Sequence, residues 1–347
     1  MAAMTALVLV QTIRLAVLNL VLPTPWADTD KVHLLQVITT RQELEVNRYP
    51  LVRSRYWDQV QVNISRLAEL TRTREIFYQQ FNDRFTQHQN LQNGQFEHRL
   101  DVIDQFKPIM TAAESASLIF TLETFAHACR TAHLQFFMTE ASLMGVTRHH
   151  GLVPWDDDVD VAMNIRQWRE TRDVLGDIRG FELYAPTDSQ WKFFMSTATV
   201  FPDKPFKFPY LDIFFYDEDS THIWAVTKGL KHDLVYRKSD IFPLLYRPFE
   251  HLTVPVPCNL DLVVHRSHDQ NECVTPEYIH KTNTNFYYGG KTTVHCGVLH
   301  DIYPFVFSTD SDVPGYREEY LKVGTEVLHK RTVPHGCPGL DTAVLNM

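Results

Sequence analysis

Apolar residues recur at helical spacing in the N-terminal third of the chain. Residues 51–105 form a polar stretch rich in Arg, Gln, Glu and Asn, with a narrow apolar stripe that predicts one or two long helices. The stripe consists of Val60, Ile64, Leu67, Leu70, Phe77, Phe81 and Phe85. We expect this stretch to form a helical stem, within residues 25–105, that precedes a larger domain.

A second helix is predicted after Pro108. Thr111 and Glu114 have the spacing of a capping box, in which the two side chains satisfy the first free amides of a helix. The buried face of this helix is expected to consist of Leu118, Leu122, Phe125 and Cys129.

Strand-like patterns then dominate as far as residue 217. The segments 134–138, 158–163, 181–185, 191–200 and 210–217 read as strands, with a turn or short helix at 142–148 and a helix at 165–178. Beyond residue 240 the chain is rich in Pro, Tyr, His and Asn, and we expect only short strands and long loops there. The order of elements predicts an α+β domain, a mixed sheet with flanking helices, over residues 106–347.

Composition excludes one broad class of partner and leaves the redox state open. The net charge of −9 over 347 residues argues against a general nucleic-acid-binding surface. The five cysteines contain no CxxC pair; they allow one or two disulfides, whose pairing the sequence does not determine. The set His265, His268 and Cys273 is either loop material or a zinc site, although its spacing matches no standard zinc motif.

Residues 1–24 allow two interpretations. The segment is apolar for most of about 18 residues, near the minimum for a membrane span. However, Arg14 lies in its middle, at a cost of roughly 2.5 to 3.5 kcal/mol for membrane insertion. The segment is therefore predicted to be either a signal anchor or an amphipathic helix packed on the domain.

The most informative stretch is PWDDDVDVAM, residues 154–163, which concentrates four aspartates between apolar flanks. Alternate residues of a strand face the same side, so Asp158 and Asp160 are expected to project together. Asp212, a lone carboxylate in an apolar strand, is expected to join them. Neighbouring carboxylates repel each other unless a cation lies between them, which predicts a catalytic Mg²⁺ (or Mn²⁺) site at these three aspartates.

A structural calcium loop and an exposed acidic turn are the alternatives for the acidic stretch. The stretch lacks the Gly and the closing Glu of an EF-hand loop, which disfavours the first. The apolar flanks disfavour the second. A metal held by carboxylates for phosphoryl or nucleotidyl transfer remains the favoured interpretation.

The stretch from Phe136 to Met163, FFMTEASLMGVTRHHGLVPWDDDVDVAM, resembles the signature of the LicD family. That family includes bacterial phosphocholine transferases and the animal proteins fukutin and fukutin-related protein. The resemblance covers roughly residues 109–259 and implies a nucleotidyltransferase-like fold. It also implies a transferase of phosphorus-containing groups that moves a phospho-polyol or phosphocholine-type group from a CDP-linked donor, of the CDP-ribitol or CDP-choline type, to a glycan or glycoprotein hydroxyl.

The resemblance assigns roles to individual residues. Asp158, Asp160 and Asp212 match the catalytic, metal-binding carboxylates of the family. On the substrate side, Ser142, Gly145 and Arg148 match the turn that precedes them, and Lys192 is a further candidate for binding the donor. For the two cations, the alternatives are a surface ion pair at Arg148 and a strand-end surface lysine at Lys192. Trp155, Asp156 and Asp157 are expected to shape the loop.

One departure from the family pattern keeps other functions open. Glu140-Ala141 replaces a Gly-containing entry to the turn, which a backbone approaching a phosphate would prefer. A catalytically inactive member acting as a scaffold in a glycan-modifying complex is therefore one alternative, and a nucleotidylyltransferase is another.

The resemblance implies a location for the protein, because animal enzymes of this family act on glycoproteins in the lumen of the Golgi or endoplasmic reticulum. An apolar N-terminus, a helical stem and a catalytic domain form the layout expected of a single-pass type II membrane enzyme there. Asn63-Ile64-Ser65 is a glycosylation sequon that would lie in that lumen. Cysteines there would be free to pair.

Overall fold

The computed structural model describes most of the chain after residue 43. The described ranges are 44–92, 102–188, 190–227, 235–267, 269–285 and 291–337. Within them, no helix combines the length and apolar character needed to cross a membrane. The apolar segment at residues 1–24, and with it the choice between an anchor and a packed helix, lies outside the described residues.

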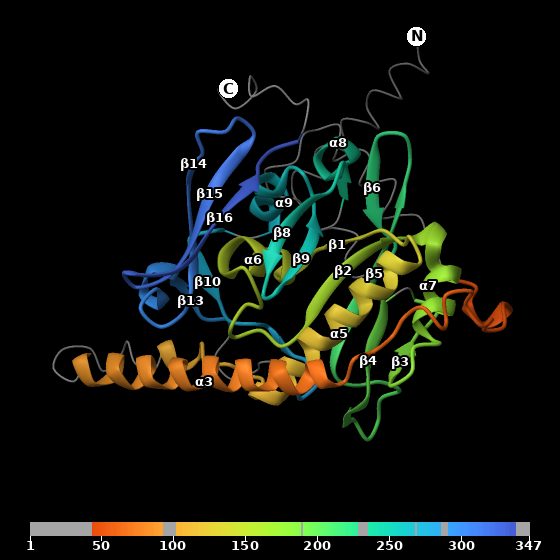
Figure 1. Ribbon diagram of the computed structural model, residues 1–347, viewed down its shortest axis with the longest axis horizontal. Helices are drawn as coiled ribbons and strands as arrows, with labels where there is room; N and C mark the ends of the chain where they lie inside the picture. Colours follow the sequence, from red (N-terminus) through yellow and green to blue (C-terminus); the bar gives the residue numbers. More distant parts are fainter. Residues whose placement is uncertain are drawn as a thin grey trace, which may run out of the picture.

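Helices lie mainly at the edges and on one face of a mixed sheet (Figure 1). The α-helices are α3 (Ser65–Gln92), α5 (Ala112–Thr131), α6 (Glu140–His149), α7 (Trp168–Leu175), α8 (Lys238–Ile241) and α9 (Leu260–Ser267). Short 3-10 helices are η1 (Val46–Arg48), η2 (Ile165–Gln167) and η4 (Cys296–Leu299).

The main sheet has the strand order β1-β2-β5-β4-β3, with β6 and β7 attached beyond β5. Its strands are β1 (Phe136–Met138), β2 (Val159–Asn164), β3 (Phe181–Tyr184), β4 (Gln190–Val200), β5 (Lys207–Glu218), β6 (His222–Ala225) and β7 (Val235–Arg237). The central pair β2 and β5 is parallel, whereas the other pairings are antiparallel. The structure confirms the predicted α+β class.

The predicted buried face of α5 is confirmed. Thr111 caps the helix, and its side chain and that of Glu114 form the reciprocal bonds of a capping box. Phe125 packs on the sheet, with ring centroids 4.9 Å from Phe136 of β1 and 6.4 Å from Phe193 of β4. Helix α5 thus packs on strands β4 and β5, the second of which carries Asp212.

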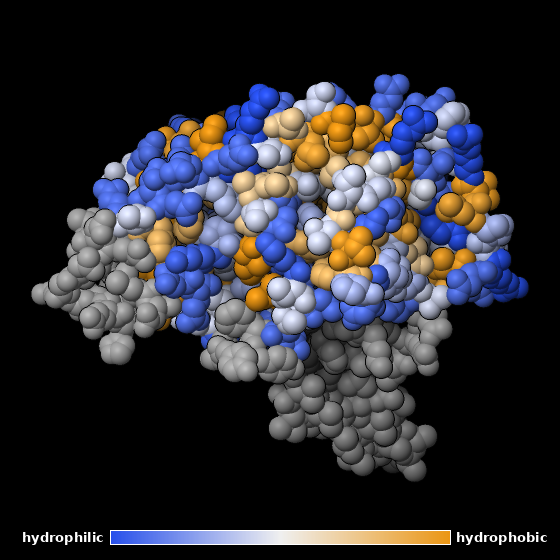
Figure 2. All heavy atoms as spheres, turned by 90° about the horizontal axis from the view of Figure 1, so that it is seen from below, coloured by the Kyte–Doolittle hydropathy of each residue, from blue (hydrophilic) through white to orange (hydrophobic). Residues whose placement is uncertain are grey.

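Helix α3 is a single helix at the lower edge of the molecule in Figure 1, where it contacts α5. Its Leu70, Phe81 and Phe85 are buried, as the apolar stripe predicts. Ile64 does not belong to that buried stripe: it lies just before the helix and is 61% exposed. The view from below in Figure 2 shows separate apolar areas among hydrophilic ones on this face. The division into stem and catalytic domain stays a prediction.

The expectation of only short strands beyond residue 240 was wrong. The C-terminal part contains a three-stranded antiparallel sheet of β14 (Phe305–Asp310), β15 (Tyr316–Val323) and β16 (Glu326–Pro334). The smaller pairs are β8 (Leu245–Phe249) with β9 (Leu252–Val256), β10 (Glu272–Val274) with β13 (Thr293–His295), and β11 (Tyr278–Ile279) with β12 (Thr284–Asn285). The alternation in β15 is weak because charged residues occupy half-buried positions there, so the pattern hides the strand.

Candidate active site

The predicted carboxylates lie on two adjacent strands. In the parallel pair β2 and β5, Asp160 lies directly opposite Asp212, and Lys192 of β4 lies opposite Asp212 on its other side. Asp158 immediately precedes β2. Side chains that oppose each other across neighbouring strands face the same side of a sheet, so these groups meet at one place.

Asp158 and Asp212 come together with a residue that the sequence did not indicate, His280. One ligand atom from each of Asp158, Asp212 and His280 lies within 4.8 Å of the other two. Asp160 is not part of this group of three within the described residues, although its charge and those of Asp158 and Asp212 act on one another. The role of Asp160 as a metal ligand stays a prediction.

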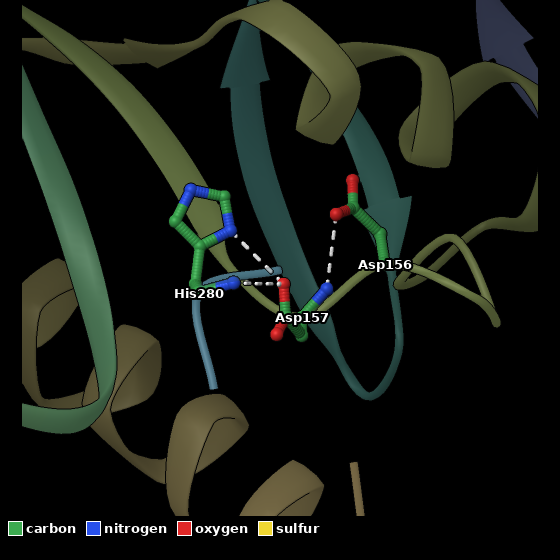
Figure 3. Close-up of side chains that lie close together, drawn as sticks. All are labelled: Asp156, Asp157 and His280. Carbon is green, nitrogen blue, oxygen red and sulfur yellow. Dashed lines mark hydrogen bonds and ion pairs between the residues drawn. The ribbon is translucent and has the colours of Figure 1, made fainter. Parts of the chain in front are cut away.

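Asp157 holds His280 in place (Figure 3). Its Oδ1 contacts Nδ1 of His280 at 2.9 Å and accepts the His280 amide at 3.2 Å, and its Oδ2 accepts the Lys281 amide at 2.8 Å. Asp156 accepts the amide of Asp157 on the other side, at 2.9 Å. Asp157 is fully buried and its oxygens are engaged in these contacts, which agrees with its predicted role in shaping the loop.

The site strongly disfavours its own negative charge. Burial, and then the neighbouring carboxylates, raise the pKa of Asp160 well above its usual value. Burial also raises the pKa of Asp158 to about 6, although His280 opposes the shift, and burial with the charge of Asp158 raises the pKa of Asp156 to about 8. Burial alone would lower the pKa of His280, but Asp158 and Asp157 outweigh it and raise that pKa to about 9. Such a cluster is stabilised by added positive charge.

Lys192 is not the strand-end surface lysine of the alternative interpretation. It is only 8% exposed, and its Nζ lies 2.6 Å from Oδ1 of Asp212 and 3.8 Å from the ring centre of Tyr210. Gln190 donates to the other oxygen of Asp212 at 3.3 Å. Lys192 therefore balances one of the clustered charges, and its role in donor binding stays a prediction.

Ser142 and Gly145, expected to contact substrate, serve the packing of α6. The hydroxyl oxygen of Ser142 accepts the backbone amide of Asp160 at 2.8 Å, which ties α6 to β2. A side chain at Gly145 would collide with the carbonyl oxygen of Gly151, so the glycine allows the chain to fold back closely after the helix. Neither is among the described residues that line the cleft.

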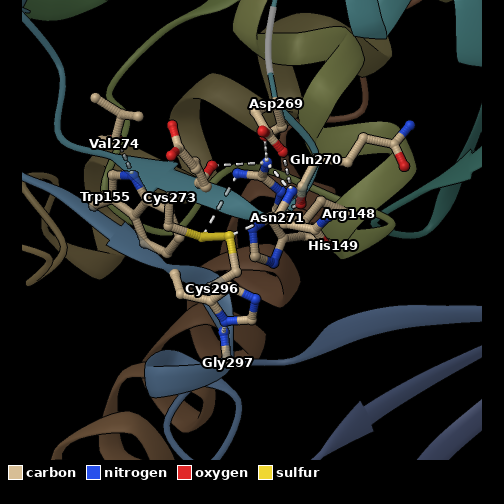
Figure 4. Close-up of a disulfide and its surroundings, with 12 residues drawn as sticks. Arg148, His149, Trp155, Asp269, Gln270, Asn271, Cys273, Val274, Cys296 and Gly297 are labelled. Atoms are coloured by element: carbon tan, nitrogen blue, oxygen red, sulfur yellow. Dashed lines mark hydrogen bonds between the residues drawn. A yellow bond between two sulfur atoms is a disulfide. The ribbon is translucent and has the colours of Figure 1, made fainter.

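Arg148 is buried and does not form the surface ion pair of the alternative. Its Nη2 donates to the carbonyl oxygens of Asp269, Gln270 and Glu272 at 3.0 to 3.2 Å (Figure 4). Burial lowers its pKa to about 10. The guanidinium thus fixes the loop before β10, although Arg148 also borders the cleft. Its role as the cation for donor phosphates stays a prediction.

One of two disulfides lies in the same region. The chain forms Cys273–Cys296, beside Arg148 in Figure 4, and Cys258–Cys337, while Cys129 is buried and unpaired. Since Cys273 is disulfide-bonded, the zinc site considered for His265, His268 and Cys273 is wrong. His268 lies outside the described residues.

A cleft of about 710 Å³ opens over the carboxylates. Asp156, Asp158, Asp160 and His280 line it, whereas Asp212 is not among its lining residues and reaches the site through its proximity to Asp158. Four further carboxylates on the wall make the cleft acidic. They belong to Glu140, Asp269, Glu272 and Glu277. An anionic donor would need positive charge at the floor before it could bind there.

His149, beside the site, gives a pH-dependent prediction for stability. Burial lowers its pKa to about 3. Its Nδ1 lies 2.7 Å from the carbonyl oxygen of Pro304. Because the unfolded chain binds a proton near pH 6.5 and the folded chain does not, stability is lost as the pH falls below 6.5. We expect this residue to remove about 2 kcal/mol of unfolding free energy by pH 5.

The measurement is urea unfolding of the wild type and His149→Asn from pH 7.5 to 5. The variant should lack that part of the acid-side loss, because the Asn amide can still donate to Pro304 and does not titrate. His265→Asn, at an exposed histidine of α9, should retain the wild-type slope. Identical slopes for the wild type and His149→Asn would contradict the prediction.

Comparison with known proteins agrees with the geometry. Residues 133–259 match the family model described as LicD/FKTN/FKRP, nucleotidyltransferase domain. A stretch of 66 residues is 30% identical to the lipopolysaccharide cholinephosphotransferase LicD of Haemophilus influenzae, covering 19% of this chain and 25% of that protein. The chain thus spans a quarter of the length of this curated relative. Asp158, Asp160 and Asp212 lie inside the matched range and His280 lies outside it. Over residues 133–259 the chain is similar to the LicD family, and the rest of the chain lies outside that match.

Proposed function

We propose that this protein is a metal-dependent transferase that moves a phospho-polyol or phosphocholine-type group from a CDP-linked donor to a glycan hydroxyl. The observation that carries the proposal is the convergence of Asp158 and Asp212 beside a cleft that Asp158 and Asp160 line. The relative from Haemophilus influenzae, a cholinephosphotransferase by name, supports the same class of reaction.

The residues present fit a divalent cation. Two carboxylates and an imidazole offer ligand atoms within 4.8 Å of one another, and the raised pKa values of Asp158 and Asp160 indicate that the fold leaves their negative charge poorly compensated. When bound, Mg²⁺ or Mn²⁺ would supply positive charge to the donor diphosphate and to the leaving group. Asp158, Asp160 and Asp212 would hold it.

The transfer exchanges one phosphorus–oxygen bond for another. The acceptor hydroxyl oxygen forms a bond to the phosphorus that carries the polyol or choline, and the bond from that phosphorus to the bridging oxygen breaks, releasing CMP. Asp212 orients the acceptor hydroxyl and takes its proton. Lys192, 2.6 Å from Asp212, keeps that carboxylate in position. Arg148, at the cleft wall, is the proposed contact for the donor phosphates.

We place the reaction in the lumen of the Golgi or endoplasmic reticulum. Two disulfides support this location because disulfides persist in oxidising compartments. Asn63 of the sequon is exposed, as an attached glycan requires. A type II anchor within residues 1–24 is part of the same proposal. Glycosidase treatment of the protein from animal cells should increase its mobility, and an unshifted protein recovered in the cytosolic fraction would contradict it.

One observation favours the inactive scaffold as a second candidate. Glu140 begins α6 with a φ of 49°, in the left-handed region that non-glycine residues rarely occupy, and its carboxylate borders the cleft. The departure at Glu140-Ala141 therefore places extra negative charge where an anionic donor would enter. A scaffold would bind its partners without turning over any donor.

The test is donor turnover. Purified protein is incubated with CDP-ribitol or CDP-choline, a glycan acceptor and Mg²⁺ or Mn²⁺, and the nucleotide products are separated by mass. Release of CMP together with a mass gain on the acceptor is the expected result. In a parallel incubation with CTP in place of the CDP-linked donor, release of pyrophosphate would identify a nucleotidylyltransferase, and the absence of turnover in both incubations would favour the scaffold.

A further inference from the structure

We propose that His280 is a nitrogen ligand of the metal site and that it makes this site bind Mn²⁺ in preference to Mg²⁺. The inference rests on the metal site of the proposed function and goes beyond it, because His280 lies outside the matched family range. The kinds of ligand atoms at a metal site determine whether it prefers Mn²⁺ or Mg²⁺.

The first observation is the direction of the imidazole ring. Its Nδ1 lies 2.9 Å from Oδ1 of Asp157, while its Nε2 lies 3.1 Å from Oδ2 of Asp158. A histidine that binds a metal through one nitrogen commonly donates its other N–H to a carboxylate, which fixes the tautomer and the ring. Asp157 is placed as that carboxylate, and Nε2 is presented to the metal-site carboxylate Asp158.

The second observation is the distance between Nε2 of His280 and the nearest oxygen of Asp158. Two atoms bound side by side to one ion at about 2.1 Å lie roughly 3.0 Å apart. The separation of 3.1 Å between Nε2 of His280 and Oδ2 of Asp158, which form an ion pair in this structure, matches that value, and a bound ion would take the place of the Nε2 proton between them. A ligand atom of Asp212 lies within 4.8 Å of both. Little rearrangement is needed for all three to contact one ion.

The third observation is that the chain fixes His280 from several sides. The ring lies against Tyr278 and Tyr210, with centroids 5.0 and 5.8 Å away. The next residue, Lys281, donates its amide to Asp157 and places its Nζ 2.7 Å from Glu114 in the capping box of α5. A side chain held this firmly on an otherwise short hairpin is preorganised for a single position.

The ligand set determines the preferred ion. Mg²⁺ is a hard cation that favours oxygen ligands and retains its water, whereas imidazole suits the first-row transition ions. Replacing one oxygen by the nitrogen of His280 therefore shifts the preference toward Mn²⁺. An all-carboxylate site at Asp158, Asp160 and Asp212 would show no such shift.

The experiment uses Mn²⁺ itself as the probe on the purified chain. Pulsed electron paramagnetic resonance of bound Mn²⁺ should show modulation from a directly coordinated ¹⁴N nucleus in the wild type and none in His280→Ala or His280→Gln. Calorimetric titration should show Mn²⁺ affinity falling about tenfold or more in both variants. The affinity for Mg²⁺ should fall by less. If His280 had a purely structural role, its replacement would instead lower the affinities for both ions equally.

His251→Ala serves as the matched control because His251 pairs with Glu123, away from the aspartates, and it should change neither signal. Bound Mn²⁺ that depends on Asp158 but shows no ¹⁴N modulation would overturn this inference alone. Equal losses of Mn²⁺ and Mg²⁺ affinity in the His280 variants would overturn it as well. Failure of the wild type to bind either ion would overturn the metal site of the proposed function together with it.

Discussion

Asp158→Asn is expected to lower kcat/KM for donor turnover by roughly 10³-fold while raising the melting temperature measured in EDTA. The two effects have opposite signs because the negative charge of Asp158 is needed at the metal site but destabilises the folded protein when no metal is bound. Burial raises the pKa of this carboxyl to about 6, so the ionised form is destabilising in the metal-free protein at neutral pH. Asn has nearly the same shape and removes that charge.

The measurement pairs CMP release with thermal unfolding in EDTA and in excess Mn²⁺. The wild type should gain stability from Mn²⁺, since a ligand that binds only the folded state stabilises it, and Asp158→Asn should gain less. Asp203→Asn, at an exposed position in the connection between β4 and β5, should match the wild type in every reading. A variant with full turnover would contradict the assignment of Asp158.

The second large effect is expected at Asp157, whose replacement by Ala should lower the unfolding free energy by about 3 kcal/mol. Asp157 is fully buried and accepts the amides of His280 and Lys281 as well as contacting the imidazole. Removal of the carboxylate leaves these donors without an acceptor in the interior. The hairpin that carries His280 should loosen as a result.

Asp156→Asn is the matched control for this measurement. Burial raises the pKa of Asp156 to about 8, so at pH 7 the carboxyl is largely protonated and resembles an amide. The Asn oxygen can still accept the amide of residue 157. We expect a change below about 1 kcal/mol for Asp156→Asn in urea unfolding. Equal destabilisation by Asp157→Ala and Asp156→Asn would contradict the anchoring role of Asp157.

Local patterns were sufficient for the first half of the domain. The capping box at Thr111 and Glu114 and the buried face of the following helix depend only on residues within a few turns of one another, so spacing alone predicts them. Strands β2, β4 and β5 are predictable for the same reason, because their apolar residues are dense. The strands of the C-terminal sheet escaped prediction since their alternation is masked by charged residues.

Individual site residues were harder to assign than the strands that carry them. Ser142 and Gly145 match a family pattern, yet their contacts are with the backbone of β2 and with Gly151. The sequence allowed Arg148 to be either a cation for the donor phosphates or part of a surface ion pair, and the fold surrounds it with loop carbonyls. A motif records which residue type occurs at a position and does not separate contact with substrate from support of the chain.

The α+β class, the resemblance to the LicD family and the two strands that carry Asp158, Asp160 and Asp212 all follow from the order of residues along the chain. The disulfide pairing, the burial of Lys192 beside Asp212 and the presence of His280 follow only from tertiary contacts. His280 follows Asp158 by more than a hundred residues, in a hairpin with no periodicity. His280 is held in place by the buried carboxylate of Asp157, whose oxygens contact the imidazole and accept the amides of His280 and Lys281. Contacts of that range leave no local pattern, because the free energy that selects them arises only once the core has packed.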